Sequence, residues 1–156
     1  MSIESVCKNE VATIEQTATL AQASQTMAER HVGSLVVVRN YDGKQIPVGI
    51  ITDRDLALVL GSSPRPQELS VEQIMRHQPI TVQISQGILE TILKMRESGV
   101  KRMPVVDDSG GLVGIVCADD LTSLISREAA ELTKITETQI RKEEGVYLPA
   151  EPQLQM

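Results

Sequence analysis

The residues of this chain with the clearest chemical potential are a hydroxyl and a carboxylate three positions apart, Thr52 and Asp55. They follow an apolar run and precede another, so the pattern places them where a strand ends and a helix begins. Free backbone N–H groups at a helix start favour anions. The same spacing also forms a capping box, in which the two side chains only satisfy the first helical turn. The sequence leaves both interpretations open, a polar binding site and a helix cap.

This junction recurs because the sequence contains an internal repeat. Residues 3–38 align with residues 71–106 at an offset of 68. After a loop three residues longer in the first copy, residues 48–50 align with residues 113–115 at an offset of 65. A repeat of this length is typical of a supersecondary unit that buries its apolar face against its twin. Two such units predict a quasi-symmetric body with paired clefts, which favours ligand sensing over catalysis.

The two copies differ at the positions that could do chemistry. The second copy keeps the carboxylate as Asp120 but has Cys117 in place of the threonine, and a thiol is a weak hydrogen-bond partner. Conversely, the basic pair Lys101 and Arg102 aligns with the uncharged residues 33–34. The two clefts are therefore predicted to be complementary rather than equal. Cys117 is interpreted as a small buried filler, with a ligand-gated thiol as the alternative.

Hydrophobic periodicity predicts strand, helix, strand, strand and helix in each copy. Residues 34–39 carry a β-branched run typical of a buried strand, and Asp42-Gly43 predicts a hairpin turn after it. Gly33 is expected to end the first helix. The predicted ranges are 11–14, a helix capped at Thr17 or Thr19 and running to about 31, 34–39, 46–51 and 52–60, then 80–84, 85–98, 103–106, 112–116 and a helix from 118.

The last helix is predicted to be much longer than its counterpart. Apolar residues recur at spacings of three and four for about twenty residues, which suits packing on the core and then on a partner helix. A helix that only caps its own domain is the alternative. Gly145 is expected to end the helix and leave residues 146–156 as a loose tail. The stripe consists of Leu121, Leu124, Ile125, Ala129, Leu132, Ile135 and Ile140.

Composition excludes several classes of function. The net charge of −6 and the pI near 5.0 argue against nucleic acid, whose backbone needs a basic face. The chain has two Tyr and no Phe or Trp, so aliphatic side chains and backbone must grip any flat ligand. The two His and two Cys form no nucleophile–base set and no metal cluster, so no enzyme is expected. Without a signal peptide or an apolar span, a cytoplasmic location with no membrane contact is expected.

The order of these motifs resembles the cystathionine-β-synthase (CBS) domain family. The resemblance rests on Gly-Ile-Ile-Thr-Asp-Arg-Asp-Leu at residues 49–56, on Val-Lys-Arg-Met-Pro-Val-Val at residues 100–106, and on the lead-in segments 3–7 and 71–75. It implies a mixed α+β (α/β) fold of two tandem β-α-β-β-α repeats, packed as a pseudo-two-fold Bateman module, to which the apolar stripe adds an extended C-terminal helix. The expected division is CBS domain 1 at 2–61, a linker at 62–70, CBS domain 2 at 71–127, and the helix extension and tail at 128–156.

The resemblance also implies an adenosine ligand, namely AMP, ADP, ATP or S-adenosylmethionine. In the family, side chains at the positions of Thr52 and Asp55 hold the ribose hydroxyls, where a carboxylate makes strong charge-assisted bonds to a diol. A basic residue at Lys101 or Arg102 faces phosphates, and a solvated basic pair is the alternative. Backbone near residues 12–13 and 80–81 reads the adenine edge. The expected ligand-binding residues are Ala12, Thr13, Ser34, Thr52, Arg54, Asp55, Ile80, Thr81, Lys101, Arg102, Met103, Pro104 and Asp120.

These observations predict a non-enzymatic regulatory module that binds an adenosine nucleotide and signals to an effector protein. The C-terminal helix is the predicted contact with that partner. The alternative is a structural or dimerisation module without a ligand, and a homodimer is expected under either interpretation. No metal is expected. A redox sensor that uses Cys7 and Cys117 is a further alternative.

Overall fold

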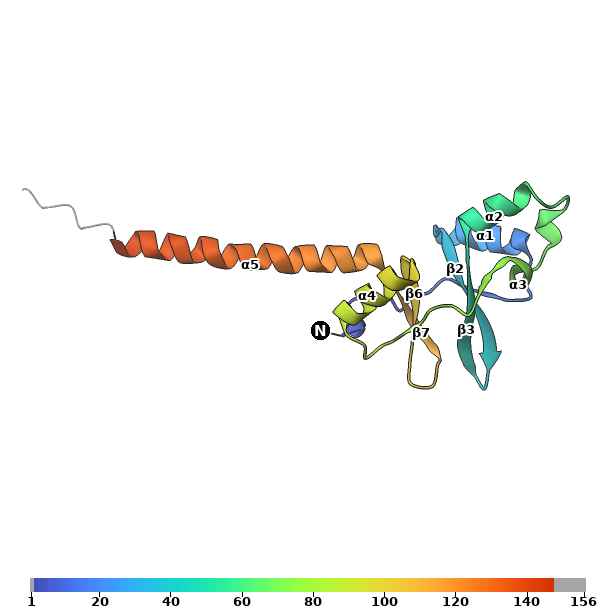
Figure 1. Ribbon diagram of the computed structural model, residues 1–156, viewed down its shortest axis with the longest axis horizontal. Helices are drawn as coiled ribbons and strands as arrows, with labels where there is room; N and C mark the ends of the chain where they lie inside the picture. Colours follow the sequence, from blue (N-terminus) through green and yellow to red (C-terminus); the bar gives the residue numbers. More distant parts are fainter. Residues whose placement is uncertain (1, 148–156) are drawn as a thin grey trace, which may run out of the picture. The chain divides into compact units, whose positions relative to one another are not determined.

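The chain separates into two units, residues 1–121 and 122–156. The computed structural model describes residues 2–147 (Figure 1). The first unit holds the strands and the short helices of both repeats, and the second holds most of the last helix. No described helix is both long enough and apolar enough to cross a membrane.

The first copy folds in the predicted order of strand, helix, strand, strand and helix. A 3-10 helix, η1 (Ile3–Ser5), precedes it. Its two long strands meet at a two-residue turn, Asp42-Gly43, where φ is 49° and 74°. Positive φ at both positions is the geometry that the Asp-Gly signal predicts for a tight hairpin. The elements are β1 (Thr13–Glu15), α1 (Leu20–Arg30), β2 (Ser34–Tyr41), β3 (Lys44–Thr52) and α2 (Asp53–Leu60).

The second copy repeats this order after a lead-in that holds three further short elements. The lead-in comprises η2 (Pro66–Glu68), α3 (Val71–Ile74) and β4 (Arg76–His77). The repeat itself comprises β5 (Val82–Gln83), α4 (Ile88–Ser98), β6 (Arg102–Val106), β7 (Leu112–Cys117) and α5 (Ala118–Tyr147). The β-α-β-β-α fold predicted for each repeat is therefore confirmed.

The segment that precedes each repeat pairs with an edge of the other repeat's sheet. The first sheet has the strand order β1-β2-β3-β4, and the second has β5-β6-β7. Strand β4 lies antiparallel to β3, with Arg76 opposite Ile50. At the equivalent edge of the second sheet, Lys8 forms an antiparallel bridge with Ile115. The offsets of 68 and 65 relate these two pairs, so the pseudo-symmetry of the sequence is also the symmetry of the contacts.

The first unit has two separate aliphatic cores, one beside each sheet. One gathers around β2, where residues 35–38 are all buried, as the β-branched run predicts. The other gathers around β6 and β7. Met27 and Met95 occupy matched places in the two cores and are 6% and 5% exposed. Because the chain has no Phe or Trp, unbranched methionine fills the spaces that aromatic rings fill elsewhere.

The starts and ends of several elements differ from the prediction. Helix α1 ends at Arg30, and His31, not Gly33, adopts the left-handed conformation with φ 53°. The amide of Val32 then donates to Met27 O at 3.0 Å, which satisfies the helix end before Gly33 is reached. Strand β5 covers only Val82–Gln83 of the predicted 80–84. Helix α4 starts after residues 85–86, since Gln86 N closes a turn onto Gln83 O at 3.0 Å.

The prediction that Gly145 ends the last helix is wrong, because α5 runs to Tyr147. A glycine inside a helix costs about 1 kcal/mol relative to alanine, which one residue in a long helix can tolerate. The first two residues of the predicted tail, 146–147, therefore belong to α5. The rest of that tail lies outside the described residues.

Candidate functional site

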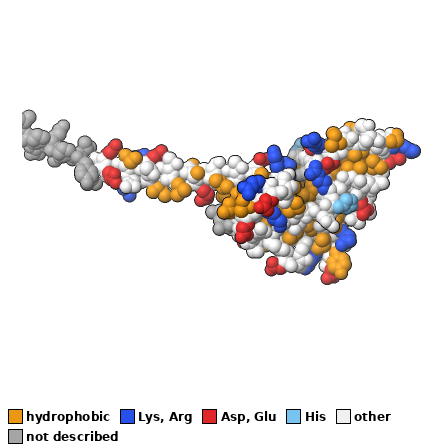
Figure 2. Space-filling view, in the orientation of Figure 1, with side chains coloured by type: hydrophobic (Ala, Val, Ile, Leu, Met, Phe, Trp, Pro, Cys, Tyr) orange, Lys and Arg blue, Asp and Glu red, His pale blue; other side chains and the backbone are white. Residues whose placement is uncertain are grey.

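A cleft of about 500 Å³ lies in the first unit, where the two repeats meet. The first repeat contributes the β3–α2 junction and the start of β2. The second contributes the end of α4 with the start of β6, and its lead-in adds β4. Figure 2 shows several Lys and Arg side chains gathered over the middle of the folded module. The lining residues are Gly33, Ser34, Ile50, Thr52, Asp53, Arg54, Arg76, His77, Gln78, Pro79, Ile80, Ser98, Gly99, Val100, Lys101 and Arg102.

Six of the thirteen ligand-binding residues expected from the sequence line this cleft. Those six are Ser34, Thr52, Arg54, Ile80, Lys101 and Arg102. The other seven, which do not line it, are Ala12, Thr13, Asp55, Thr81, Met103, Pro104 and Asp120. Of these, Met103 is fully buried in the second core, and the carbonyl of Thr81 accepts a hydrogen bond from Lys94 Nζ at 2.8 Å. Thr13 lines a separate surface hollow beside β1.

Thr52 and Asp55 form the capping box of α2. Asp55 Oδ2 accepts from Thr52 N at 2.9 Å and from Thr52 Oγ1 at 2.8 Å. In return, Asp55 N donates to Thr52 Oγ1 at 3.2 Å. Both side chains are half-buried, and both of these hydrogen bonds to the carboxylate fall on Oδ2. The capping interpretation is therefore correct for the local structure, and the binding interpretation needs the same carboxylate to accept from a ligand as well.

Glycine brings the start of β2 close to this junction. Asp53 N donates to Gly33 O at 3.0 Å, and a Cβ built on Gly33 would lie 3.0 Å from Asp53 Oδ2. The same backbone contact recurs in the second repeat, where Ala118 N donates to Lys101 O at 2.9 Å. The strand start and the helix start thus form one continuous wall in each repeat, and Thr52 lies opposite Ser34 in the β2–β3 ladder.

The cleft is electropositive. Four basic side chains line it, namely Arg54, Arg76, Lys101 and Arg102, against a single carboxylate among the lining residues, Asp53. One Asp53 oxygen already accepts from Arg54 N at 2.8 Å. Cations that converge on a concave surface concentrate positive potential there and attract anionic ligands. The arrangement suits phosphate groups better than it suits a cationic ligand.

Sequence reasoning missed the contribution of β4 to this cleft. Arg76 and His77 line it because β4 pairs with β3 across the boundary between the copies. Two exposed polar residues carry no hydrophobic periodicity, so they give no strand signal. The repeat could have indicated this contribution, because Arg76 aligns with Lys8 and both residues are basic.

At the pseudo-symmetric position of the second repeat, an ion pair holds the carboxylate. Lys8 Nζ lies 2.8 Å from Asp120 Oδ1, and this hydrogen bond raises the pKa of Lys8 above its usual value. Asp120 Oδ2 is buried and has no hydrogen-bond partner among the described residues. Cys117, opposite Arg102 in the β6–β7 ladder, takes the place that Thr52 has in the first repeat. The second junction therefore has a thiol where the first has a hydroxyl. The two junctions are chemically unequal, as the sequence predicts.

Both thiols are predicted to be poor nucleophiles. Burial raises the pKa of Cys7 and of Cys117, because a buried thiolate loses hydration, and the charge of Arg102 offsets only part of the effect at Cys117. A raised pKa lowers the thiolate fraction at a given pH. We expect both to react with iodoacetamide at pH 8 more slowly than free cysteine, and to reach its rate in urea. Mass spectrometry of the alkylated peptides measures each rate. Folded Cys117 that reacts as fast as free cysteine would instead favour a redox role.

Among the described residues, no group of three or more His, Cys, Asp or Glu side chains is placed to hold a metal ion. The cleft offers a ligand its basic side chains and its apolar walls, whereas the backbone N–H groups of residues 53–55 already donate within the chain. Ile50, Pro79, Ile80 and Val100 form those walls. This composition suits a ligand with one flat apolar part and one anionic part.

Comparison with known proteins identifies relatives of both repeats. The chain matches the model of the CBS domain over residues 3–62 and 71–127. It is 35% identical over 122 residues to an uncharacterised protein of Methanopyrus kandleri, a match that covers 78% of this chain and 61% of the relative. It is 27% identical over 124 residues to a homoserine O-acetyltransferase of Methanococcus vannielii, which covers 80% of this chain and 25% of the enzyme. The chain thus spans less than two thirds of either relative.

Solved structures share the fold. A crystallised CBS domain pair in complex with 5′-methylthioadenosine and S-adenosyl-L-methionine is 26% identical and superposes with a TM-score of 0.68. The match covers 80% of this chain and 99% of that chain. The architecture of two tandem repeats is therefore one that occurs as a complete module in a solved protein.

Proposed function

Because this chain belongs to the CBS domain family, we propose that it is a non-enzymatic regulatory module that binds an adenosine nucleotide between its repeats. The bound nucleotide shifts the module towards one conformation or one dimer geometry, and an effector protein reads that change. Such regulation requires the ligand to prefer one state, since equal affinity for both shifts nothing. The module acts in the cytoplasm, as a homodimer.

One observation carries this proposal: the cleft places four cations beside a hydroxyl at a strand–helix junction. The ribose diol binds at the hydroxyl of Thr52 and at the carboxylate of Asp55, which does not itself line the cleft but is hydrogen-bonded to that hydroxyl at 2.8 Å. Arg102, Lys101 and Arg76 contact the phosphates, and the aliphatic walls hold the adenine in place of an aromatic stack. The related CBS pair is solved with S-adenosyl-L-methionine and 5′-methylthioadenosine, which supports an adenosine ligand.

The charge of the cleft selects among adenosine ligands. S-adenosylmethionine carries a sulfonium cation, which four basic side chains repel, whereas each phosphate of AMP, ADP or ATP adds negative charge. We therefore propose that ATP and ADP bind more tightly than AMP, and that all three bind more tightly than adenosine or S-adenosylmethionine. Each tenfold step in affinity corresponds to about 1.4 kcal/mol.

A thermal-shift titration tests this order directly. A ligand at about 100 times its dissociation constant stabilises the folded state by roughly 2.7 kcal/mol, which raises Tm by about 5 °C or more in a chain of this size. We expect the shift to fall from ATP through AMP to adenosine. Arg102→Ala should weaken ATP more than adenosine. Arg65→Ala, which removes an exposed arginine away from the cleft, is the matched control.

The alternative function is a structural or dimerisation module that has lost its ligand. The Lys8–Asp120 ion pair favours it, because a protein side chain already occupies the carboxylate of the second junction. Under this alternative none of the adenosine compounds raises Tm, either in the parent or in Arg102→Ala. A shift with any one phosphorylated nucleotide rejects it.

A further inference from the structure

An ion pair occupies the carboxylate at the β7–α5 junction of the second repeat, the second junction. Lys8 Nζ lies 2.8 Å from Asp120 Oδ1, and the two side chains are 61% and 24% exposed. The other carboxylate oxygen, Oδ2, is buried and has no hydrogen-bond partner among the described residues. One oxygen is therefore engaged and the other is shielded from solvent. A ligand diol would have to displace Lys8 from Oδ1 or share that oxygen with it.

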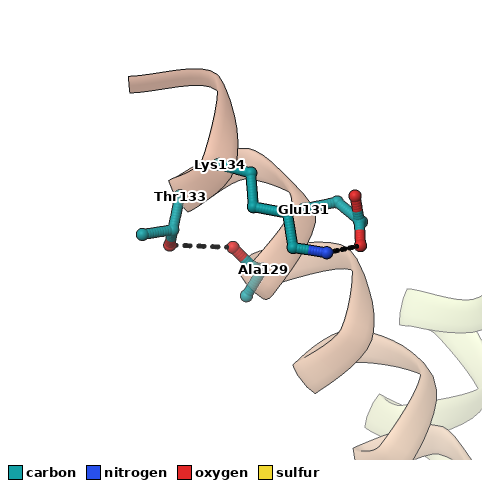
Figure 3. Close-up of polar contacts among 4 residues, drawn as sticks. All are labelled: Ala129, Glu131, Thr133 and Lys134. Atoms are coloured by element: carbon teal, nitrogen blue, oxygen red, sulfur yellow. Dashed lines mark hydrogen bonds and ion pairs between the residues drawn. The ribbon is translucent and has the colours of Figure 1, made fainter. Parts of the chain in front are cut away.

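This ion pair differs from one that forms within a single helical turn. Lys134 Nζ lies 2.6 Å from Glu131 Oε1 in α5 (Figure 3), and both of these side chains are exposed. Lys8 instead comes from the segment before β1 and reaches the start of α5. Its backbone is fixed beside β7, because Lys8 N donates to Ile115 O and Ile115 N donates to Lys8 O, both at 3.0 Å. The strand pairing therefore places the ammonium group beside Asp120.

The equivalent residues at the β3–α2 junction of the first repeat, the first junction, are not paired in this way. The repeat offsets relate Lys8 to Arg76 and Asp120 to Asp55. Arg76 lines the cleft, and in the part of the chain that the structure describes no ion pair joins it to Asp55. The charge of Arg76 thus remains available to a ligand, whereas the charge of Lys8 is neutralised by the protein itself.

The residue at the strand end adds a second difference. In the first junction, Thr52 Oγ1 donates to Asp55 Oδ2 at 2.8 Å and so orients the carboxylate. The second junction has Cys117 at that position, and a thiol is a weak hydrogen-bond donor. Both differences make the second junction a poorer place for a ribose diol than the first.

We propose that Lys8 and Cys117 together close the second junction to nucleotides, so that each chain binds one nucleotide, at the first junction. The inference rests on the proposed function and adds to it the number of sites and the residues that set this number. Lys8 holds the carboxylate, and Cys117 offers a ligand no hydroxyl in exchange. An ion pair with an exposed lysine is weak by itself, so both residues must change before the junction opens.

Equilibrium dialysis of the full chain counts the bound nucleotides. At saturating ATP we expect one ATP per chain in the parent and one in Asp120→Ala, with the same affinity. The matched variant Asp55→Ala should bind ATP at least about 100-fold more weakly. Two ATP bound by the parent, or a site lost in Asp120→Ala, would overturn the closed second junction alone. A parent that binds no ATP would instead overturn the proposed function on which the count rests.

Opening the second junction is the complementary measurement, with adenosine as the probe because it needs the diol contact but no cation. Lys8→Ala combined with Cys117→Thr should bind one adenosine more than the parent, whereas Cys117→Thr alone should bind the same number as the parent. Lys134→Ala combined with Cys117→Thr is the matched control, since it removes an ion-paired lysine of similar exposure that does not line the cleft. No additional site in the first double variant would overturn the role of Lys8. Loss of a site in Lys8→Ala would make Lys8 a ligand contact instead.

Discussion

Gly114→Ala is expected to lower the free energy of unfolding by about 1–3 kcal/mol, the usual range for overpacking a well-packed site. A Cβ at this position of β7 would overlap Cys7 Sγ and would lie 2.9 Å from the carbonyl oxygen of Lys8. That carbonyl cannot withdraw without loss, because it accepts from Ile115 N at 3.0 Å, and Lys8 N donates to Ile115 O at 3.0 Å. Urea denaturation of parent and variant measures the change.

Two further variants separate the two contacts. Cys7→Ala combined with Gly114→Ala removes the sulfur overlap but leaves the carbonyl, so it should recover only part of the loss. Gly61→Ala is the control, because a Cβ there meets only Leu58 O at 3.8 Å. If Gly114→Ala is as stable as Gly61→Ala, the lead-in segment does not pack on β7 as described. Gly49 has the same arrangement against Met75 and Arg76, with the Arg76 carbonyl oxygen at 2.9 Å.

The repeat in the sequence predicted most of the fold. Its two offsets, read from hydrophobic and glycine positions, also predict the strand register. Ser34 pairs with Thr52, and the residues at the shifted positions, Arg102 and Cys117, pair with each other. Such agreement arises because one apolar pattern buries one face in both copies, and a slip of one residue would expose it.

The sequence did not predict the features that depend on tertiary contacts or on a single backbone angle. Strand β4 is two exposed residues long and exists because β3 offers an edge beside Gly49. The left-handed residue after α1 is His31, whereas its counterpart after α4 is Gly99. Glycine is favoured in that conformation, so the sequence suggested Gly33 instead. The alignment of His31 with Gly99 was the signal that could have placed it.

The candidate site was predictable in part for the same reason. Thr52, Arg54 and the basic pair at 101–102 belong to recognisable motifs, and they do meet in one cleft. Arg76 comes from a segment whose position depends on strand exchange between the copies. The pairing of Lys8 with Asp120 joins residues 112 positions apart, which no local pattern indicates.

Asp55→Ala is expected to reduce the affinity for ATP by at least about 100-fold, which corresponds to about 2.7 kcal/mol. The carboxylate, already oriented by Thr52 N at 2.9 Å, is proposed to accept both ribose hydroxyls, and a hydrogen bond to a charged group contributes about 1.5–3 kcal/mol. The same change removes half of the α2 capping box, so it should also lower stability by about 1 kcal/mol. Calorimetric titration measures the first effect, and urea denaturation the second.

Helix α1 supplies a matched control for this prediction, because it begins with a capping box of the same geometry. Thr19 N donates to Gln22 Oε1 at 2.9 Å, and Gln22 N donates to Thr19 Oγ1 at 3.2 Å. Gln22→Ala should therefore cost about the same stability and leave nucleotide affinity unchanged, because Gln22 lines the separate hollow beside β1 and caps a helix that does not border the cleft. If both variants lose stability alike and both bind ATP as tightly as the parent, Asp55 is only a cap. The basic side chains alone would then account for nucleotide affinity. In that case adenosine, which has no phosphate, should not compete with ATP.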